Sequence, residues 1–312
     1  MLAKSSKTYK SSKSLMRKYP IYLMMVPGFI YLFFNNYIPI AGLTIAFKNI
    51  DFRKGILKSD WIGFRNFEYL FKTKDALIIT RNTLLYNAAF ILLGIVFGVI
   101  AALLMNEVSN KRLLKIYQTA ILSPQLVSWI VVSYFVYALL SIDKGMVNNR
   151  ILPLLGIKEI SWYTEPKYWP FILTIMQIWK SIGFNSIIYL ATIVGIDTEY
   201  YEAATLDGAS RNQQIIHITL PLLVPTIITL FLIHVGRIFY ADFGLFFQVP
   251  MNSGALFSTT NVIDTYVYRA LLQIGDIGMS AAAGFYQSIV GFALILVSNL
   301  IIRKFNKENA LF

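Results

Sequence analysis

Few side chains in this 312-residue chain could do chemistry alone. It has no cysteine, and its two histidines, His217 and His234, are far apart in sequence, so thiol and zinc chemistry have no ligand set. Nucleotide, zinc-protease and hydrolase signatures (G-x-x-x-x-G-K-[ST], H-E-x-x-H, G-x-S-x-G) are missing from it. We therefore expect that this chain is not an enzyme and that it holds neither a metal nor a cofactor. We interpret His217 as a residue at the membrane interface.

Polar side chains inside apolar stretches are the stronger signal. They form a stripe repeating every four residues and a group near the end of the next stretch: Gln177, Ser181 and Asn185, then His234, Arg237, Tyr240 and Asp242. A charged group at the centre of a membrane span costs ~2.5–3.5 kcal/mol, so such residues face the helix bundle or a wet cavity. The pattern predicts a passage for a polar solute.

Each group also has a purely structural interpretation. The stripe could form hydrogen bonds between helices, and Arg237 with Asp242 could form an ion pair that fixes helix packing. Trp129 and Tyr134 could stack on the apolar faces of sugar rings, or they could belong to an interfacial belt or the core, as could Tyr137.

A second pattern, E-A-A-x3-G-x9-I-x-L-P, lies between two apolar stretches. Its fixed positions are Glu202, Ala203, Ala204, Gly208, Ile218, Leu220 and Pro221, with Asp207 just before the glycine. Asp197 is a good helix N-cap, Gly208 can adopt the left-handed conformation that ends a helix, and Ser210 with Gln213 fits a capping box. We expect a helix from about Glu199, a corner at Gly208, and a second helix from Arg211 that is kinked or restarted at Pro221.

Composition indicates the elements that carry these patterns. The chain is 56% hydrophobic and 14% charged, against ~45–50% apolar and ~25% charged in soluble domains. A helix needs about 20 residues to cross a bilayer. Six apolar stretches are long enough: 19–47, 84–105, 116–142 with a kink at Pro124, 168–196, 218–236 and 277–302. We expect an all-α integral membrane domain of six helices over residues 19–302, after a basic leader (1–18) and before a tail (303–312). The first stretch is too long for a signal peptide, so we interpret it as a retained helix.

Basic residues set the expected orientation. The leader and the tail are both rich in Lys and Arg, which favours two cytoplasmic termini. The loop from Lys48 to Arg81 is also basic, but its aromatic residues at 61, 64, 67 and 71 recur at helical spacing, which predicts a helix on the membrane surface. The net charge of +12 sits at the ends of apolar spans, so we expect anionic lipid and not nucleic acid as its partner.

The E-A-A pattern resembles the cytoplasmic signature of membrane-spanning subunits of ATP-binding-cassette importers. Flanking segments 37–48, 61–67 and 82–84 look like the carbohydrate branch of the type I importer permeases, whose cargoes include oligosaccharides. The resemblance implies the type I permease fold, with residues 197–221 as the coupling elbow and the pattern positions plus Asp207 as its contacts with the ATPase. It also implies a bacterial-type plasma membrane, a second, different permease, two cytoplasmic ATPases that hold the Mg–ATP, and an external solute-binding protein.

Two alternatives remain open. The same fold could carry amino acids, phosphate or another small non-sugar solute. A carrier driven by an ion gradient could work alone, although such carriers often show internal repeats and intramembrane acids, and this sequence has no obvious repeat.

Overall fold

The structure, a computed structural model, describes residues 20, 22–68 and 72–305. The predicted leader lies outside these residues, as does most of the tail. Within these residues, five helices are long and apolar enough to span a membrane: Tyr22–Phe47, Lys74–Asn106, Pro166–Val194, Arg211–Val235 and Ile277–Lys304. A bent pair, Lys111–Leu126 with Trp129–Leu140, brings the count to as many as six. The expectation of an all-α membrane fold is confirmed. Its two compact units meet in sequence between Asn66 and Phe67.

The first unit holds one long helix and a small hairpin. The helix ends in α2 (Ile38–Ala41) and a 3-10 stretch (Gly42–Phe47). β1 (Lys48–Asn49) then pairs antiparallel with β2 (Asp60–Trp61). Asn66 Nδ2 donates to the Ala46 and Lys48 carbonyls at 3.0 and 2.9 Å, which closes the loop.

The prediction of a surface helix in this loop is wrong for its described part. Residue 61 lies in a strand, a 3-10 turn covers Arg65–Phe67, and Phe71 lies outside the described residues. The Phe47 ring stacks on Trp61 and meets Phe64 edge-on, both at 5.4 Å between centroids, so these two aromatic residues pack on Phe47 and not along one face of a helix.

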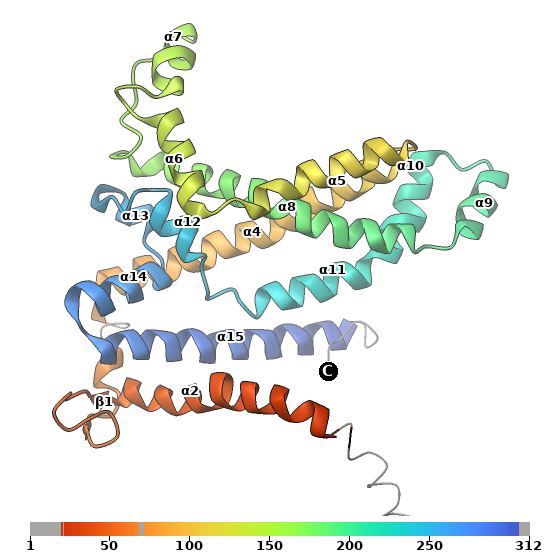
Figure 1. The fold of residues 1–312 in the computed structure, drawn as a ribbon. Helices are drawn as coiled ribbons and strands as arrows, with labels where there is room; N and C mark the ends of the chain where they lie inside the picture. Colours follow the sequence, from red (N-terminus) through yellow and green to blue (C-terminus); the bar gives the residue numbers. More distant parts are fainter. Residues whose placement is uncertain (1–19, 21, 69–71, 306–312) are drawn as a thin grey trace, which may run out of the picture. The chain divides into compact units, whose positions relative to one another are not determined.

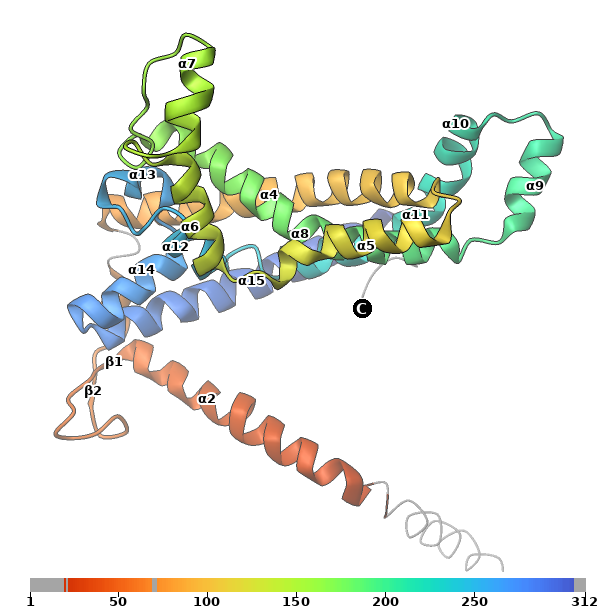
Figure 2. The ribbon, with the colours of Figure 1, turned by 45° about the horizontal axis from the view of Figure 1, so that its top comes forward.

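The second unit is a bundle of long helices (Figure 1). Its helices are α4 (Lys74–Asn106), α5 (Lys111–Leu126), α6 (Trp129–Leu140), α7 (Leu152–Leu154), α8 (Trp169–Val194), α9 (Thr198–Leu206), α10 (Arg211–Gln214), α11 (Leu220–Val235), α12 (Phe243–Gln248), α13 (Phe257–Thr260), α14 (Ile263–Arg269) and α15 (Ile277–Phe305). Short 3-10 turns cover Pro166–Tyr168 and Gly254–Leu256. Figures 1 and 2 both show α9 and α10 at one end of this bundle and α12–α14 at the other.

Helix α8 packs closely against α4 and α5 because glycines remove side chains at the contacts. A Cβ on Gly98 of α4 would lie 3.1 Å from the Tyr189 ring, and one on Gly183 of α8 would lie 2.1 Å from the Ile121 carbonyl oxygen. Gly94 and Gly98 form a small-x-x-x-small pattern, which lets membrane helices approach closely.

The third predicted span is not one kinked helix. α5 passes through Pro124 and ends at Leu126, and α6 starts at Trp129 after a turn of 94°. Ser123 Oγ donates to the Ala120 carbonyl at 2.9 Å, replacing the amide that proline lacks. Ser128 then caps α6, where its hydroxyl accepts from the Val131 amide. The bend therefore lies just after the position predicted.

Widened turns accommodate other prolines. Three π-turns, Phe33–Tyr37, Val147–Ile151 and Ile215–Thr219, each end two residues before a proline: Pro39, Pro153 and Pro221. A proline inside a helix has no amide to donate and crowds the carbonyl four residues earlier, and an i→i+5 turn gives that carbonyl room. Residues Arg211–Val235 consequently form one candidate span, so of the two alternatives expected at Pro221, a kink or a restart, the helix does not restart and instead widens into the π-turn before the proline. A fourth π-turn, Ala270–Ile274, precedes Gly275 instead.

Candidate functional site

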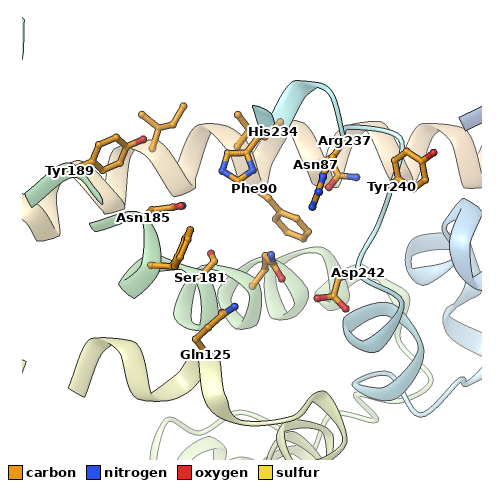
Figure 3. A pocket seen from close by; sticks show the side chains of 14 residues that line it. Asn87, Phe90, Gln125, Ser181, Asn185, Tyr189, His234, Arg237, Tyr240 and Asp242 are labelled. Atoms are coloured by element: carbon orange, nitrogen blue, oxygen red, sulfur yellow. The ribbon is translucent and has the colours of Figure 1, made fainter. Parts of the chain in front are cut away.

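A cavity of about 390 Å³ opens inside the second unit (Figure 3). Seven of the nine predicted pathway residues line it: Gln177, Ser181, Asn185, His234, Arg237, Tyr240 and Asp242. The polar stripe on α8 thus faces the same space as the group that follows α11. α11 ends at Val235, so Arg237, Tyr240 and Asp242 belong to the link between α11 and α12 rather than to a span.

Sequence reasoning missed the rest of the lining. α4 contributes Asn87, Phe90, Ile91 and Ile95, α5 contributes Gln125, and α8 adds Phe184 and Tyr189. Asn87 carried a usable signal, because it is a polar residue inside a predicted span. The apolar members carried none, since nothing in the sequence distinguishes them from lipid-facing residues.

The link 236–242 is fixed by hydrogen bonds from three elements. Asn87 Nδ2 donates to the Ile238 carbonyl at 3.0 Å, and Gln287 Nε2 on α15 donates to the Phe239 carbonyl at 2.7 Å. Asp264 of α14 accepts from the Ala241 amide at 2.7 Å, while burial raises the pKa of its carboxyl group. These bonds hold the cavity residues of the link in place.

Trp129 and Tyr134, the two other predicted pathway residues, do not line the cavity. The Trp129 indole instead donates to Asp242 Oδ2 at 2.7 Å, and the Tyr134 side chain is 66% exposed on α6. Lys180 lies with its ammonium 5.0 Å from the centre of the Trp129 ring and donates to the Pro124, Gln125 and Val127 carbonyls. A cation at the end of α5 complements its dipole, so Lys180 and Trp129 brace the bend beside the cavity.

One buried polar atom of the cavity has no hydrogen-bond partner among the described residues. Gln177 Oε1 is buried and, among the described residues, accepts no hydrogen bond. The ion pairs among the described residues do not include Arg237 with Asp242. Asp242 also caps α12 by accepting from the Leu245 amide at 3.3 Å. A buried acceptor left unpaired costs free energy, so the cavity is suited to a ligand rich in hydroxyl groups.

The segment 197–221 folds as the short helix α9, a corner, and the beginning of the helix Arg211–Val235, whose first part is α10. Asp197 caps α9 by accepting from the Glu199 amide at 3.0 Å. Gly208 has φ +81°, and the amides of Gly208 and Ala209 donate to the Thr205 and Ala204 carbonyls, which is the Schellman arrangement. Gln213 Oε1 accepts from the Ser210 amide at 2.7 Å, as a capping box requires.

This elbow, residues 197–221, presents an uncovered surface. α9 has no buried residue, and its Tyr200 and Leu206 side chains are 59% and 90% exposed. Glu202, Ala203, Asp207, Gly208 and Pro221 are also exposed, while Ala204, Ile218 and Leu220 are half-buried. Tyr201 is tied inward, its hydroxyl 2.9 Å from Thr219 Oγ1.

Long apolar helices around a polar cavity, with an exposed elbow at one end, define a multi-pass membrane protein of the transporter class. Residues 94–307 match the family described as "Binding-protein-dependent transport system inner membrane component", and the chain belongs to that family.

Known relatives match nearly the whole chain. Protein LplB of Bacillus subtilis (strain 168) is 35% identical over 92% of this chain and 90% of its own length. The polygalacturonan/rhamnogalacturonan transport system permease protein YteP of the same organism is 33% identical over 95% of this chain and 91% of its own length. A solved chain of a bacterial ABC transporter involved in the import of the acidic polysaccharide alginate superposes with a TM-score of 0.86 at 33% identity, covering 95% of this chain and 99% of that one. The expected resemblance to ABC importer permeases is confirmed.

Proposed function

We propose that this chain is a permease subunit of an ATP-driven importer of oligosaccharides and forms half of the translocation pathway. The observation that carries the proposal is the cavity, which combines hydrogen-bonding side chains with ring faces such as Phe90 and Tyr240. Sugars present hydroxyl groups and apolar C–H faces together. The similarity to a polygalacturonan permease and to an alginate importer supports the same cargo class.

The remaining partners follow from this function. Two cytoplasmic ATPases bind and hydrolyse Mg–ATP, a second and different permease completes the pathway, and an external binding protein delivers the solute. Both termini lie in the cytoplasm of a bacterial-type cell, and the basic ends of the spans contact anionic lipid. The elbow docks on one ATPase through its exposed surface, with Glu202, Gly208 and their pattern neighbours at the contact.

Transport then proceeds by alternating access. ATP closes the ATPase dimer, the two elbows move together, and the helix bundle shifts between inward-open and outward-open packings. Moving a population from 1:99 to 99:1 takes about 5.5 kcal/mol of differential binding. Two nucleotides and a docked binding protein can supply this, whereas a neutral sugar alone cannot.

Uptake by the reconstituted importer tests the proposal. Labelled fragments of polygalacturonate, alginate and maltodextrin are offered alongside amino acids and phosphate. We expect uptake of one or more oligosaccharides, with the solute affinity changed by Gln177→Ala or Asn185→Ala while the basal ATP hydrolysis of the complex is retained. Uptake of amino acids or phosphate alone would contradict the cargo, and unchanged uptake in both variants would move the pathway away from this cavity.

A further inference from the structure

The elbow makes a direct polar contact with the corner between α4 and α5. Glu107 caps the C-terminal end of α4, and its Oε1 accepts from Arg211 Nε at 2.9 Å and from Arg211 Nη2 at 2.8 Å. Both N–H groups of one guanidinium edge therefore hold a single carboxylate oxygen, an orientation that lysine cannot reproduce.

Arg211 also joins the two helices of the elbow. Its Nη1 donates to Gln214 Oε1 at 3.2 Å in α10, and its guanidinium carbon lies 5.7 Å from the centre of the Tyr201 ring in α9. Gln214 Nε2 in turn donates to Thr205 Oγ1 at 2.9 Å. One side chain thus contacts α9, α10 and the end of α4.

No other polar link of this kind is found in the described part of the chain. Among its hydrogen bonds and ion pairs, those from elbow residues 197–214 to residues 107–126 are the bonds of Arg211 to Glu107. The elbow is continuous in sequence with α8 and α11, so these two helices follow it through the backbone. α4 and α5, which contribute Asn87 and Gln125 to the cavity, are not continuous with the elbow, and they reach it through their packing against α8 and through this pair.

We propose that the Arg211–Glu107 pair is the positioning contact that makes the α4–α5 corner follow the elbow when the ATPase moves it. This inference rests on the proposed coupling function. The two side chains are 47% and 45% exposed, and exposed ion pairs contribute little to folding stability. We therefore expect the fold to stay intact when the pair is broken, so that its loss is seen in the relative movement of the two segments and not in stability.

Distance measurements in the assembled importer test this directly. The chain has no native cysteine, so Ser109→Cys in the corner and Asn212→Cys in the elbow, both exposed, accept nitroxide labels at defined sites. Distances are recorded in the nucleotide-free complex and with ATP and vanadate. With Arg211 and Glu107 intact, we expect the distance between the two labels to be the same in both states.

Breaking the pair should let the elbow move without the α4–α5 corner. In Arg211→Gln and in Glu107→Gln we expect the distance to differ between the states by about 2 Å or more, the scale of helix shifts in switching proteins. The charge-swapped chain, Glu107→Arg with Arg211→Glu, should restore a constant distance. Lys72→Gln, which breaks the exposed pair with Glu68 elsewhere, is the matched control and should behave as the unmodified protein.

The outcomes separate this inference from the proposed function. A distance that stays constant in both single variants, or that already changes in the unmodified protein, overturns the role of the pair. A cross-link from Asp207→Cys to the ATPase tests the docking of the elbow independently. If that cross-link forms while the pair variants behave as the unmodified protein, only the inference fails; if no cross-link forms, the proposed docking of the elbow on the ATPase fails and the inference fails with it.

Discussion

At the scale of single residues, the conformation of Gly208 determines the shape of the elbow. A Cβ at this position would meet no atom within 4 Å, so only its φ of +81° restricts substitution. An alanine held in the left-handed region costs roughly 1–2 kcal/mol, whereas asparagine tolerates it. We expect Gly208→Ala to speed hydrogen exchange at the Ala209 amide by about tenfold and to lower the coupling of transport to ATP hydrolysis.

Gly208→Asn is the matched control for this prediction. It adds a larger side chain at the same open position but keeps the backbone conformation, so protection and coupling should stay close to those of the unmodified protein. Equal losses in both variants would show that the elbow needs the absence of a side chain, for example for close docking on a partner, and not the conformation of glycine.

The pathway residues show which single-residue signals can be read from a sequence. Polar groups inside apolar stretches or just after one predicted seven lining residues, because burial in a membrane leaves such groups few alternatives. Tyr134 and Trp129 were chosen for aromatic character alone, and that property also suits an exposed or bracing side chain. Apolar lining residues such as Ile91 could not be predicted, since their role depends only on the direction in which a helix face points.

At the scale of elements, the close approach of α8 and α5 depends on Gly183. Because a Cβ there would lie 2.1 Å from the Ile121 carbonyl oxygen, the backbones must separate to accept it. We expect Gly183→Ala to destabilise the protein by about 1–3 kcal/mol, as overpacking does, and to lower its thermal unfolding midpoint. Gly284→Ala in α15, where no atom lies within 4 Å, should leave the midpoint unchanged or raise it. Equal midpoints for both variants would contradict the packing argument.

The contact of Asp264 with the cavity link predicts a dependence on pH. Burial raises the folded pKa of Asp264 above its ordinary value of 3.8. Protonated Asp264 therefore contributes to folding stability below pH 3.8, and this contribution is lost as the pH rises through the folded pKa. Asp264→Asn can still accept from the Ala241 amide but does not ionise. We expect its thermal midpoint, relative to the unmodified protein, to increase with pH; a pH-independent difference would show that ionisation of Asp264 is not involved.

The helices, bends and strands differ in how far residues close in sequence determine their positions. The elbow was predicted closely because its caps, Asp197 and Ser210, and its corner glycine act within a few residues. The bend after α5 was placed at Pro124, but Ser123 and Lys180 satisfy carbonyls around it and move the turn to residues 127–128. The spacing of residues 61, 64, 67 and 71 predicts a helix where residue 61 lies in β2, because helical spacing alone does not reveal pairing with a segment 11 to 13 residues away, as in Asn49 with Asp60 and Lys48 with Trp61.

At the scale of the whole molecule, two features bear on how the second unit lies in the membrane. The Arg211–Glu107 pair places the loop 107–110 beside the elbow, so both belong on the same side. The loop that contains Lys158 follows α7 and precedes α8, on the opposite side if the bent pair of α5 and α6 crosses once. The proposed function requires the elbow side to be cytoplasmic, because the ATPases are there.

Labelling of single cysteines decides this orientation. In the cysteine-free chain, Ser109→Cys and Lys158→Cys both introduce an exposed thiol. A membrane-impermeant maleimide should label Lys158→Cys in intact cells but Ser109→Cys only after the membrane is opened, because a charged reagent does not cross the hydrocarbon layer. The reverse pattern would place the elbow outside, where it could not meet a cytoplasmic ATPase. Labelling of both in intact cells would mean that α5 and α6 do not form one crossing, and the six-span arrangement would then fail.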